Sequence, residues 1–125
     1  MNRILIQSKD YIEFFQTLNE RTKEKIKYCE SILISAMPIN QKFVKKIVCS
    51  DFYELRVSVD NEVRIILFAI DHENINLATK IVLLNGFIKK SNKDYNPNIK
   101  KAISILNKII EDTPNYENEI SQDKQ

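Results

Sequence analysis

Hydrophobic residues in the first third of the chain recur at the spacing of an amphipathic helix. Apolar side chains separated by three, four or seven positions are Tyr11, Phe14, Phe15, Leu18, Ile26, Cys29, Ile32 and Leu33. This period indicates helix, and the polar stretch 19–22 divides it, which predicts two helices at about 10–19 and 21–36. Pro38 is expected to end the second helix because proline cannot continue one.

The middle of the chain changes to the alternating pattern of β-strands. Strands are predicted at about 52–59, 63–70 and 80–89. The first alternates apolar and polar residues, as expected of a half-buried strand, whereas the second is apolar on both sides, which indicates a central strand. Residues 3–7 alternate weakly and predict a short edge strand, while 42–48 fits neither pattern clearly.

The register of the first two of these strands can be predicted from their side chains. A two-residue turn would pair Val57 with Arg64 and place the arginine in the core. An odd-length turn around 59–61 instead pairs Arg56 with Arg64 and Val57 with Val63, which keeps the core apolar. We therefore expect both arginines on one outward face, where an anionic ligand would offset their mutual repulsion.

Helix boundaries are indicated by capping residues and prolines. Ser8 or Asp10 can cap the first helix, and Asn96 followed by Pro97 fits the start of a last helix. Pro114 is expected to close that helix. Its predicted apolar stripe comprises Ile99, Ala102, Ile103, Leu106, Ile109 and Ile110.

Charge is distributed unevenly along the chain, although the net charge is only +2. Residues 80–110 contain seven lysines and one acidic residue, whereas 111–125 contain five acidic residues and one lysine. A basic body suits an anionic partner, and a solvated lysine-rich surface is the open alternative. At 125 residues the chain predicts one domain. Its start lacks a signal peptide's apolar region, so we expect a cytoplasmic protein without membrane association.

A few single residues also carry structural information. Cys29 and Cys49 are expected to be reduced and largely buried, and His72 to be a solvated loop residue. Gly86, the only glycine, lies inside a predicted strand. That position indicates a bulge or the close approach of another backbone or a ligand, RNA included.

From about Phe43 to Leu106 the sequence resembles the RelE/ParE superfamily of toxins from type II toxin–antitoxin operons, most of all its HigB branch. The resemblance is carried by four segments in order: 43–46 (FVKK), 53–57 (YELRV), 63–68 (VRIILF) and 83–90 (LLNGFIKK). It implies an α+β fold with two N-terminal helices packed on a twisted antiparallel sheet of three to four strands, and a C-terminal helix. The toxin domain would span 1–113, followed by a disordered acidic tail at 114–125.

The resemblance also implies a function. Such proteins are ribosome-dependent mRNA endoribonucleases that need no metal or other cofactor and are neutralised by a cognate antitoxin, for the HigB branch a helix-turn-helix, HigA-like protein. The residues that it places in catalysis are Arg56, Arg64, Lys89, Lys90 and Tyr95. Those that it places against RNA are Lys45, Lys46, Glu54, Asn85 and Lys93. A lysine, Lys90 or Lys89, is the expected proton-transfer group, because Asn85 stands where many relatives have histidine and an amide cannot exchange a proton near neutral pH.

Alternatives remain open from the sequence. The chain could be a ParE-like gyrase inhibitor or an RNA-binding member without catalysis. Glu54 and Arg56 could form a surface ion pair, and the Lys89-Lys90 pair could protect an edge strand. The aromatic residues of the first helix are expected in the core, with an exposed antitoxin groove as the alternative.

Overall fold

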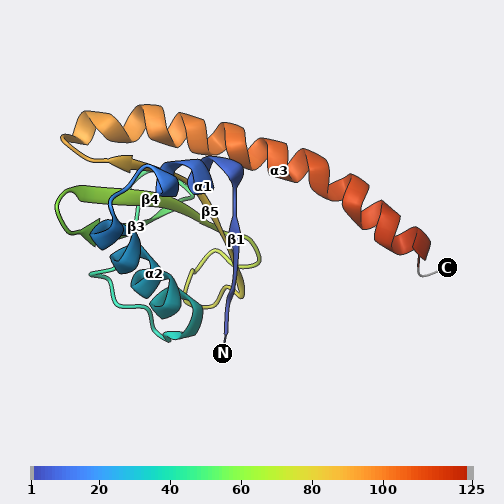
Figure 1. Ribbon diagram of the computed structural model, residues 1–125. Coiled ribbons are helices and arrows are strands. Elements are labelled where there is room, and N and C mark those ends of the chain that lie inside the picture. The colour runs from blue at the N-terminus through green and yellow to red at the C-terminus, as the bar shows by residue number, and fades with distance from the viewer. Residues whose placement is uncertain (1, 124–125) are drawn as a thin grey trace.

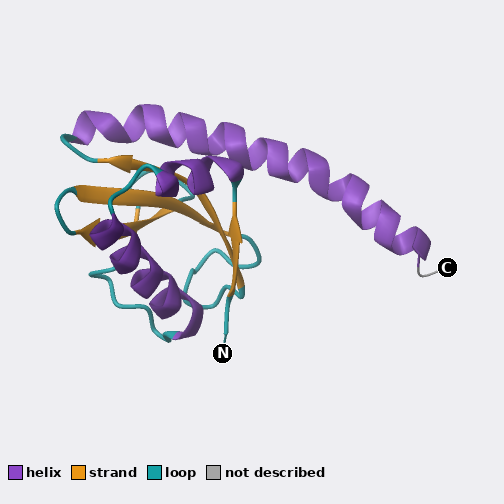
Figure 2. Ribbon diagram, in the orientation of Figure 1, coloured by secondary structure: helices purple, strands orange, loops and turns teal. Residues whose placement is uncertain are grey.

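The computed structural model describes the backbone of residues 2–123 and the side chains of residues 2–112. A mixed sheet of five strands in the order β1-β5-β4-β3-β2 carries helices on both faces (Figures 1 and 2). The elements in chain order are β1 (Ile4–Gln7), α1 (Lys9–Gln16), α2 (Glu20–Ser35), β2 (Val44–Lys46), β3 (Tyr53–Ser58), β4 (Glu62–Ala69), β5 (Lys80–Ile88), a 3₁₀ turn (Asn92–Asp94) and α3 (Tyr95–Asp123).

The α+β class, the two N-terminal helices and the three long strands are confirmed, but the sheet is larger than expected. β2 to β5 are antiparallel, and β1 adds to β5 in parallel. The prediction of a purely antiparallel sheet of three to four strands was therefore wrong. β1 is the short edge strand predicted at residues 3–7, but its parallel pairing of Ile4 with Lys80 joins segments far apart in the sequence and leaves no local signal. β2 has three residues, which is too short to show an alternating pattern.

The predicted register of the central hairpin is confirmed. Arg56 lies opposite Arg64, and Val57 lies opposite Val63. Because side chains of directly opposed residues share a face, the two arginines lie on one face and the valines on the other. The valines belong to the core beneath α1 and α2, and the arginines lie on the face that α3 partly covers.

Two apolar cores lie on opposite faces of the sheet. The larger one joins α1 and α2 to the sheet and the smaller one joins α3 to it. β4 contributes Ile65 to the first and Ile66 to the second, which confirms that it is a central strand buried on both faces. Full burial of one such side chain is worth roughly 1.5–3 kcal/mol. The aromatic residues of α1 pack on the larger core, as predicted.

Gly86 is explained by a side chain of this protein, not by RNA. A Cβ atom at position 86 would overlap the ring of Phe14, which packs on β5 from α1. Another group does approach Gly86 closely, as inferred from sequence, but that group is the Phe14 ring of the apolar core. The bulge lies nearby, where the β4–β5 register shifts between Ile66 and Leu67.

The helix caps correct two sequence predictions. Ser8, and not Asp10, caps α1 by accepting a hydrogen bond from the Tyr11 amide at 3.0 Å. The approach to α3 is capped by Ser91, which forms a capping box with Asp94, so the prediction for Asn96 was wrong. The reciprocal pair of bonds satisfies amide groups that a lone asparagine would leave free.

α3 continues past Pro114 to Asp123 and extends beyond the sheet (Figure 1). The prediction that Pro114 ends the helix was therefore wrong. The side chains of 113–123 and residues 124–125 lie outside what the structure describes, so the division into a domain and an acidic tail stays a prediction. Within the described part of the chain, no helix is both long and apolar enough to cross a membrane.

A buried arginine ties the N-terminus to the body of the protein. The Arg3 guanidinium is 3% exposed and donates only to backbone carbonyl oxygens. Their distances are 3.1 Å to Ala78, 3.0 Å to Leu33, 2.7 Å to Ala36 and 2.8 Å to Asn76. The side chain thereby links β1, the end of α2 and the connection before β5.

The cysteines differ from each other. Cys29 lies on the buried face of α2, and burial raises the pKa of its thiol. Cys49 is exposed on the turn between β2 and β3, so the expectation of two largely buried thiols held for one of them. His72 is exposed, as predicted, and its Nδ1 accepts a hydrogen bond from the Asn74 amide at 2.9 Å.

Candidate functional site

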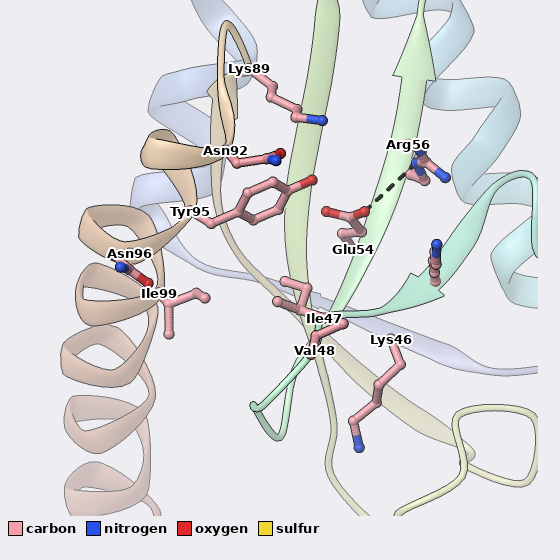
Figure 3. Close-up of a pocket in the computed structure, with 11 residues that line it drawn as sticks. Lys46, Ile47, Val48, Glu54, Arg56, Lys89, Asn92, Tyr95, Asn96 and Ile99 are labelled. Carbon is pink, nitrogen blue, oxygen red and sulfur yellow. Dashed lines mark ion pairs between the residues drawn. The ribbon is translucent and has the colours of Figure 1, made fainter.

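A cavity of about 440 Å³ opens between the beginning of α3 and the β2–β3 edge of the sheet (Figure 3). Its walls bring together six of the ten residues proposed from sequence, with five others that were not proposed. The lining residues are Lys45, Lys46, Ile47, Val48, Glu54, Arg56, Lys89, Asn92, Tyr95, Asn96 and Ile99. The cavity forms because α3 covers the β5 side of this face and leaves the β3 side open.

Glu54 is the central residue of the cavity. The side chain is buried, and its Oε1 lies 3.6 Å from Nε of Arg56, while Oε2 lies 4.0 Å from Nε of Arg64. Oε2 has no hydrogen-bond partner among the described residues. Buried polar atoms in native proteins are nearly always hydrogen-bonded, so this oxygen marks a position where a ligand group or water is expected.

Arg64 lies beneath the cavity and is 3% exposed. Its Nη1 donates to Glu62 Oε2 at 3.1 Å and to the Val63 carbonyl at 3.0 Å, whereas its Nε has no hydrogen-bond partner among the described residues. Burial alone would lower the pKa of Arg64, but interactions with Tyr95, Glu62 and Glu54 hold it above its ordinary value.

These contacts correct the expectation of two outward arginines. They share a face as predicted, but Arg64 is buried and Arg56 half-exposed. The two carboxylates of Glu54 and Glu62 already offset the repulsion between them. An anionic ligand is therefore not required to explain the arrangement, and the case for one rests on the unpaired atoms.

Tyr95 forms the wall of the cavity that belongs to α3. Its ring packs edge-on against Phe87 with centroids 5.5 Å apart, and Nζ of Lys89 lies 5.6 Å from the ring centroid. In Figure 3 the hydroxyl of Tyr95 points toward the Glu54 carboxylate. Burial raises the pKa of Tyr95, and the charge of Glu54 raises it further. The phenol is therefore neutral at physiological pH and available as a hydrogen-bond donor.

Asn85 lies outside the cavity, under the start of α3. It is 1% exposed, and its Nδ2 donates to the Asn98 carbonyl at 3.2 Å. The side chain faces the helix and does not line the cavity, so its contact with RNA stays a prediction. The side chain connects β5 to the first turns of α3 through this hydrogen bond.

The lysines fall into two groups. Lys89 lines the cavity, whereas its neighbour Lys90 is exposed and does not line it. Lys93 is likewise exposed beyond the lining. Lys46 lines the outer wall, but its amino group extends away from Glu54 in Figure 3 and lies 5.3 Å from the Tyr53 ring centroid. β1 pairs with β5 only from Lys80 to Leu83 among the described residues, so edge protection by the Lys89-Lys90 pair stays an open alternative.

Two kinds of residue were missed from sequence. Asn92 and Asn96 flank Tyr95 in the sequence, and their separation of four is typical of one helix face, so spacing could have found them. Ile47, Val48 and Ile99 supply apolar wall. The first two lie in the segment whose pattern was ambiguous, and no local signal identified them.

The cavity can bind a phosphodiester and transfer a proton. Arg56 and Lys89 offer cationic donors for phosphate oxygens. Glu54 offers a carboxylate within the same space, and Tyr95 a neutral hydroxyl. A carboxylate beside fixed cations is a plausible proton acceptor during attack of a hydroxyl on phosphorus, where the cations stabilise the developing charge.

The comparisons with known proteins agree with this fold. The family described as "phage derived protein Gp49-like (DUF891)" matches residues 13–107. A mutant of the E. coli toxin RelE in the free state superposes with a TM-score of 0.59 at 13% identity, over 83% of this chain and 97% of RelE. A chain of the intact E. coli RelBE toxin–antitoxin complex gives a TM-score of 0.51 at 14% identity, over 71% and 99%. No curated protein matches the sequence. At these identities the structures establish a RelE-like fold.

Proposed function

The chain belongs to the Gp49-like family of phage-derived proteins, and with its RelE-like fold as a second premise we propose that it is a toxin that cleaves mRNA. The observation that carries this proposal is the buried Glu54 carboxylate, which lies between Arg56 and Arg64 in a cationic cavity and whose Oε2 has no hydrogen-bond partner among the described residues. A binding protein needs the cations alone. A carboxylate among the cations weakens the binding of a polyanion, but it can accept a proton.

The proposed reaction is transesterification within the RNA. Glu54 accepts the proton of the ribose 2′-hydroxyl as its oxygen forms a bond to the adjacent phosphorus. The bond from phosphorus to the 5′-oxygen breaks, and Lys89 donates a proton to that oxygen. The products are a 2′,3′-cyclic phosphate and a 5′-hydroxyl end, with no metal required.

The remaining cavity residues stabilise charge and position the substrate. Arg56 and Arg64 hold the negative charge that builds on the phosphorane, a contribution that typically amounts to about 3 kcal/mol per donor. Tyr95 donates to a phosphate oxygen or stacks on a base. This assignment moves the proton acceptor from a lysine, as the sequence suggested, to Glu54.

The biological setting is part of the same proposal. RelE is by its description a toxin and RelBE a toxin–antitoxin complex. We assign to this chain an antitoxin partner, of the helix-turn-helix HigA-like type that goes with the HigB branch. The substrate is mRNA under translation on the ribosome in the cytoplasm, where the exposed Lys45 and Lys93 contact RNA phosphates.

The test uses two adjacent lysines that differ in position. The 5′ ends of mRNA are mapped after brief expression of the wild type, Glu54→Gln, Lys89→Ala and the matched control Lys90→Ala. New ends within reading frames are expected from the wild type and Lys90→Ala, and roughly 10²-fold fewer from the other two. End-group analysis should find 5′-hydroxyls.

Other outcomes would assign a different function. Growth arrest without new ends, together with inhibited DNA supercoiling, would identify a gyrase inhibitor. Absence of both arrest and new ends would identify an RNA-binding member without catalysis. New ends that are equally abundant with Glu54→Gln would reject the carboxylate as proton acceptor.

A further inference from the structure

The two edges of the sheet differ in charge. The strand order places β1 at one edge and β2 at the other, and within the described chain neither has a second strand partner (Figure 1). β2 carries the exposed Lys45 and Lys46, and lysine on an edge strand discourages pairing with another chain. β1 has the sequence ILIQ without a charged residue, and Ile4 and Ile6 are 58% and 39% exposed. An exposed, uncharged and apolar edge strand is a site where another strand can add.

The backbone of β1 has hydrogen-bonding groups that point away from the sheet. The amides of Ile4 and Ser8 donate to carbonyl oxygens on the β5 side, at 2.8 Å and 3.1 Å. Backbone groups of successive residues in a strand point to opposite sides, so those of Leu5 and Gln7 point outward. Beyond them the part of the chain that the structure describes has no further strand, so these groups are available to another molecule.

The open stretch of this edge is short and has defined ends. The Arg3 amide, which also points outward, donates to the Ile34 carbonyl at the end of α2 at 2.8 Å. At the other end β1 stops at Gln7, and α1 begins at Lys9. Only the segment from Leu5 to Gln7 is therefore open, and a long foreign strand would gain no more backbone hydrogen bonds here than a short one.

A second copy of the same strand satisfies this stretch completely. With a two-fold axis at Ile6, antiparallel pairing places Leu5 of each copy opposite Gln7 of the other, and each such pair exchanges two backbone hydrogen bonds. Ile6 then lies opposite the same residue of the other copy, so two exposed apolar side chains cover each other and no like charges meet. An axis at Leu5 would instead require the Arg3 amide, which is already used within the fold.

We propose that β1 pairs with β1 of a second copy of this chain, antiparallel and centred on Ile6, so that two sheets become one. A contact of this length belongs to the weak interfaces that bury under about 1,200 Å², so the dimer forms at micromolar or higher concentration. β1 and the cationic cavity lie at opposite edges of the sheet, and both cavities therefore stay open in the dimer. The proposal does not depend on the proposed function.

Disulfide trapping tests the pairing and its register together. Ile6→Cys and the matched control Ile4→Cys are made in a Cys49→Ser background, which removes the exposed thiol and leaves the buried Cys29. Opposed residues that do not exchange hydrogen bonds lie about 4.5 Å apart at Cα, a separation that a disulfide spans. Ile6→Cys should therefore form a covalent dimer with copper phenanthroline in air. Ile4→Cys is at the more exposed position but lies opposite Ser8 of the other copy, so it should not.

Sedimentation equilibrium measures the association without cross-linking. The wild type, Ile6→Lys and the matched control Ile12→Lys are compared from micromolar to near-millimolar concentration. Ile6 and Ile12 are both 39% exposed, but Ile12 lies on α1 and not on the edge strand. Lysine at position 6 places two like charges opposite each other, so the dissociation constant of the dimer should rise at least about tenfold. Ile12→Lys should associate as the wild type does, and melting curves of each variant establish folding.

Support requires a concentration-dependent dimer, weakening by Ile6→Lys alone, and cross-linking through position 6 but not through position 4. A wild type that stays monomeric over the whole range would overturn the proposal, even if β1 binds a strand of another protein. Equal effects of Ile6→Lys and Ile12→Lys would also overturn it, as would cross-linking at position 4 as fast as at position 6. If Ile6→Lys does not fold, the two cysteine variants decide the matter.

Discussion

Arg3 and Arg64 are each 3% exposed, yet their guanidinium groups have different surroundings. Arg3 donates to four backbone carbonyls and forms no ion pair among the described residues. Arg64 donates to one carboxylate and one carbonyl, and its Nε lies 4.0 Å from a second carboxylate without a hydrogen bond among the described residues. The donor groups of Arg3 are used by the fold, whereas Arg64 still has a donor without an acceptor.

The difference shows that burial alone does not distinguish a structural cation from a functional one. Carbonyl oxygens bear partial charges and fix the geometry of Arg3 from two segments of the chain, so its role ends within the fold. Arg64 is held by Glu62 and faces the carboxylate of Glu54 beside an open cavity. Its Nε faces Glu54 Oε2 at 4.0 Å, and Glu54 in turn lines the cavity.

The largest expected effect is on folding, from Arg3→Met. Removal of the guanidinium leaves several buried carbonyls without a donor, and we expect a loss of about 3–5 kcal/mol in the free energy of unfolding. Urea denaturation followed by circular dichroism measures it. The control is Arg21→Met, an exposed ion pair with Asp60 whose loss should cost under about 1 kcal/mol. A loss below about 1 kcal/mol for Arg3→Met would remove the distinction between the two arginines.

Arg64→Met should affect RNA cleavage more than folding, the reverse of Arg3→Met. We expect RNA cleavage to fall roughly 10²-fold, about 3 kcal/mol of transition-state stabilisation. The free energy of unfolding should fall less than for Arg3→Met, since Arg56 still faces the buried Glu54 carboxylate and Glu62 is half-exposed to solvent. Single-turnover cleavage and urea denaturation on the same preparation separate the two effects. Equal activity of Arg64→Met and the wild type would place Arg64 with Arg3 as a structural residue.

Glu62→Gln tests the positioning of Arg64, because it changes an ion-pair partner of Arg64 and leaves the arginine in place. The amide keeps a weaker hydrogen bond in place of a charge-assisted one, so we expect cleavage about fivefold slower, or about 1 kcal/mol. The effect should fall on kcat more than on KM, because Glu62 positions the guanidinium and does not itself line the cavity. Ser58→Ala removes the hydroxyl that donates to Glu62 and should give a smaller change in the same direction. An effect confined to KM would argue against a positioning role.

The smallest expected effect is on thermal stability, from Asp71. This residue lies in the connection between β4 and β5 to which Arg3 also donates hydrogen bonds. Hydrogen bonds from Thr79 and from the Lys80 amide lower the pKa of Asp71 to about 2. A pKa that is lower in the folded state stabilises above the unfolded value of about 4, and that contribution is lost as the pH falls toward 2. The melting temperature of the wild type should exceed that of Asp71→Asn at pH 6, and the difference should vanish near pH 2. A difference that stays constant over that range would contradict the assignment.

Local patterns anticipated a large part of the fold. The period of about 3.6 located α1 and α2, and alternation located β3, β4 and β5. The need to keep the core apolar was enough to pair Arg56 with Arg64. The candidate site was anticipated in part, since Arg56, Glu54, Lys89 and Tyr95 line one cavity. Asn85 and Lys90 do not line it, which the sequence could not show because a strand pattern does not reveal which helix covers a face or where a strand leaves the sheet.

The sequence alone determined the elements, the central register and the basic character of the region around β3 to β5, because these depend on residues close in the chain or directly opposed across one hairpin. Tertiary structure decided which arginine is buried, which oxygen of Glu54 lacks a partner, and that Gly86 makes room for Phe14. Those features depend on where α1 and α3 pack on the sheet. Contacts between segments tens of residues apart leave no periodic signal, so only the folded chain defines the site.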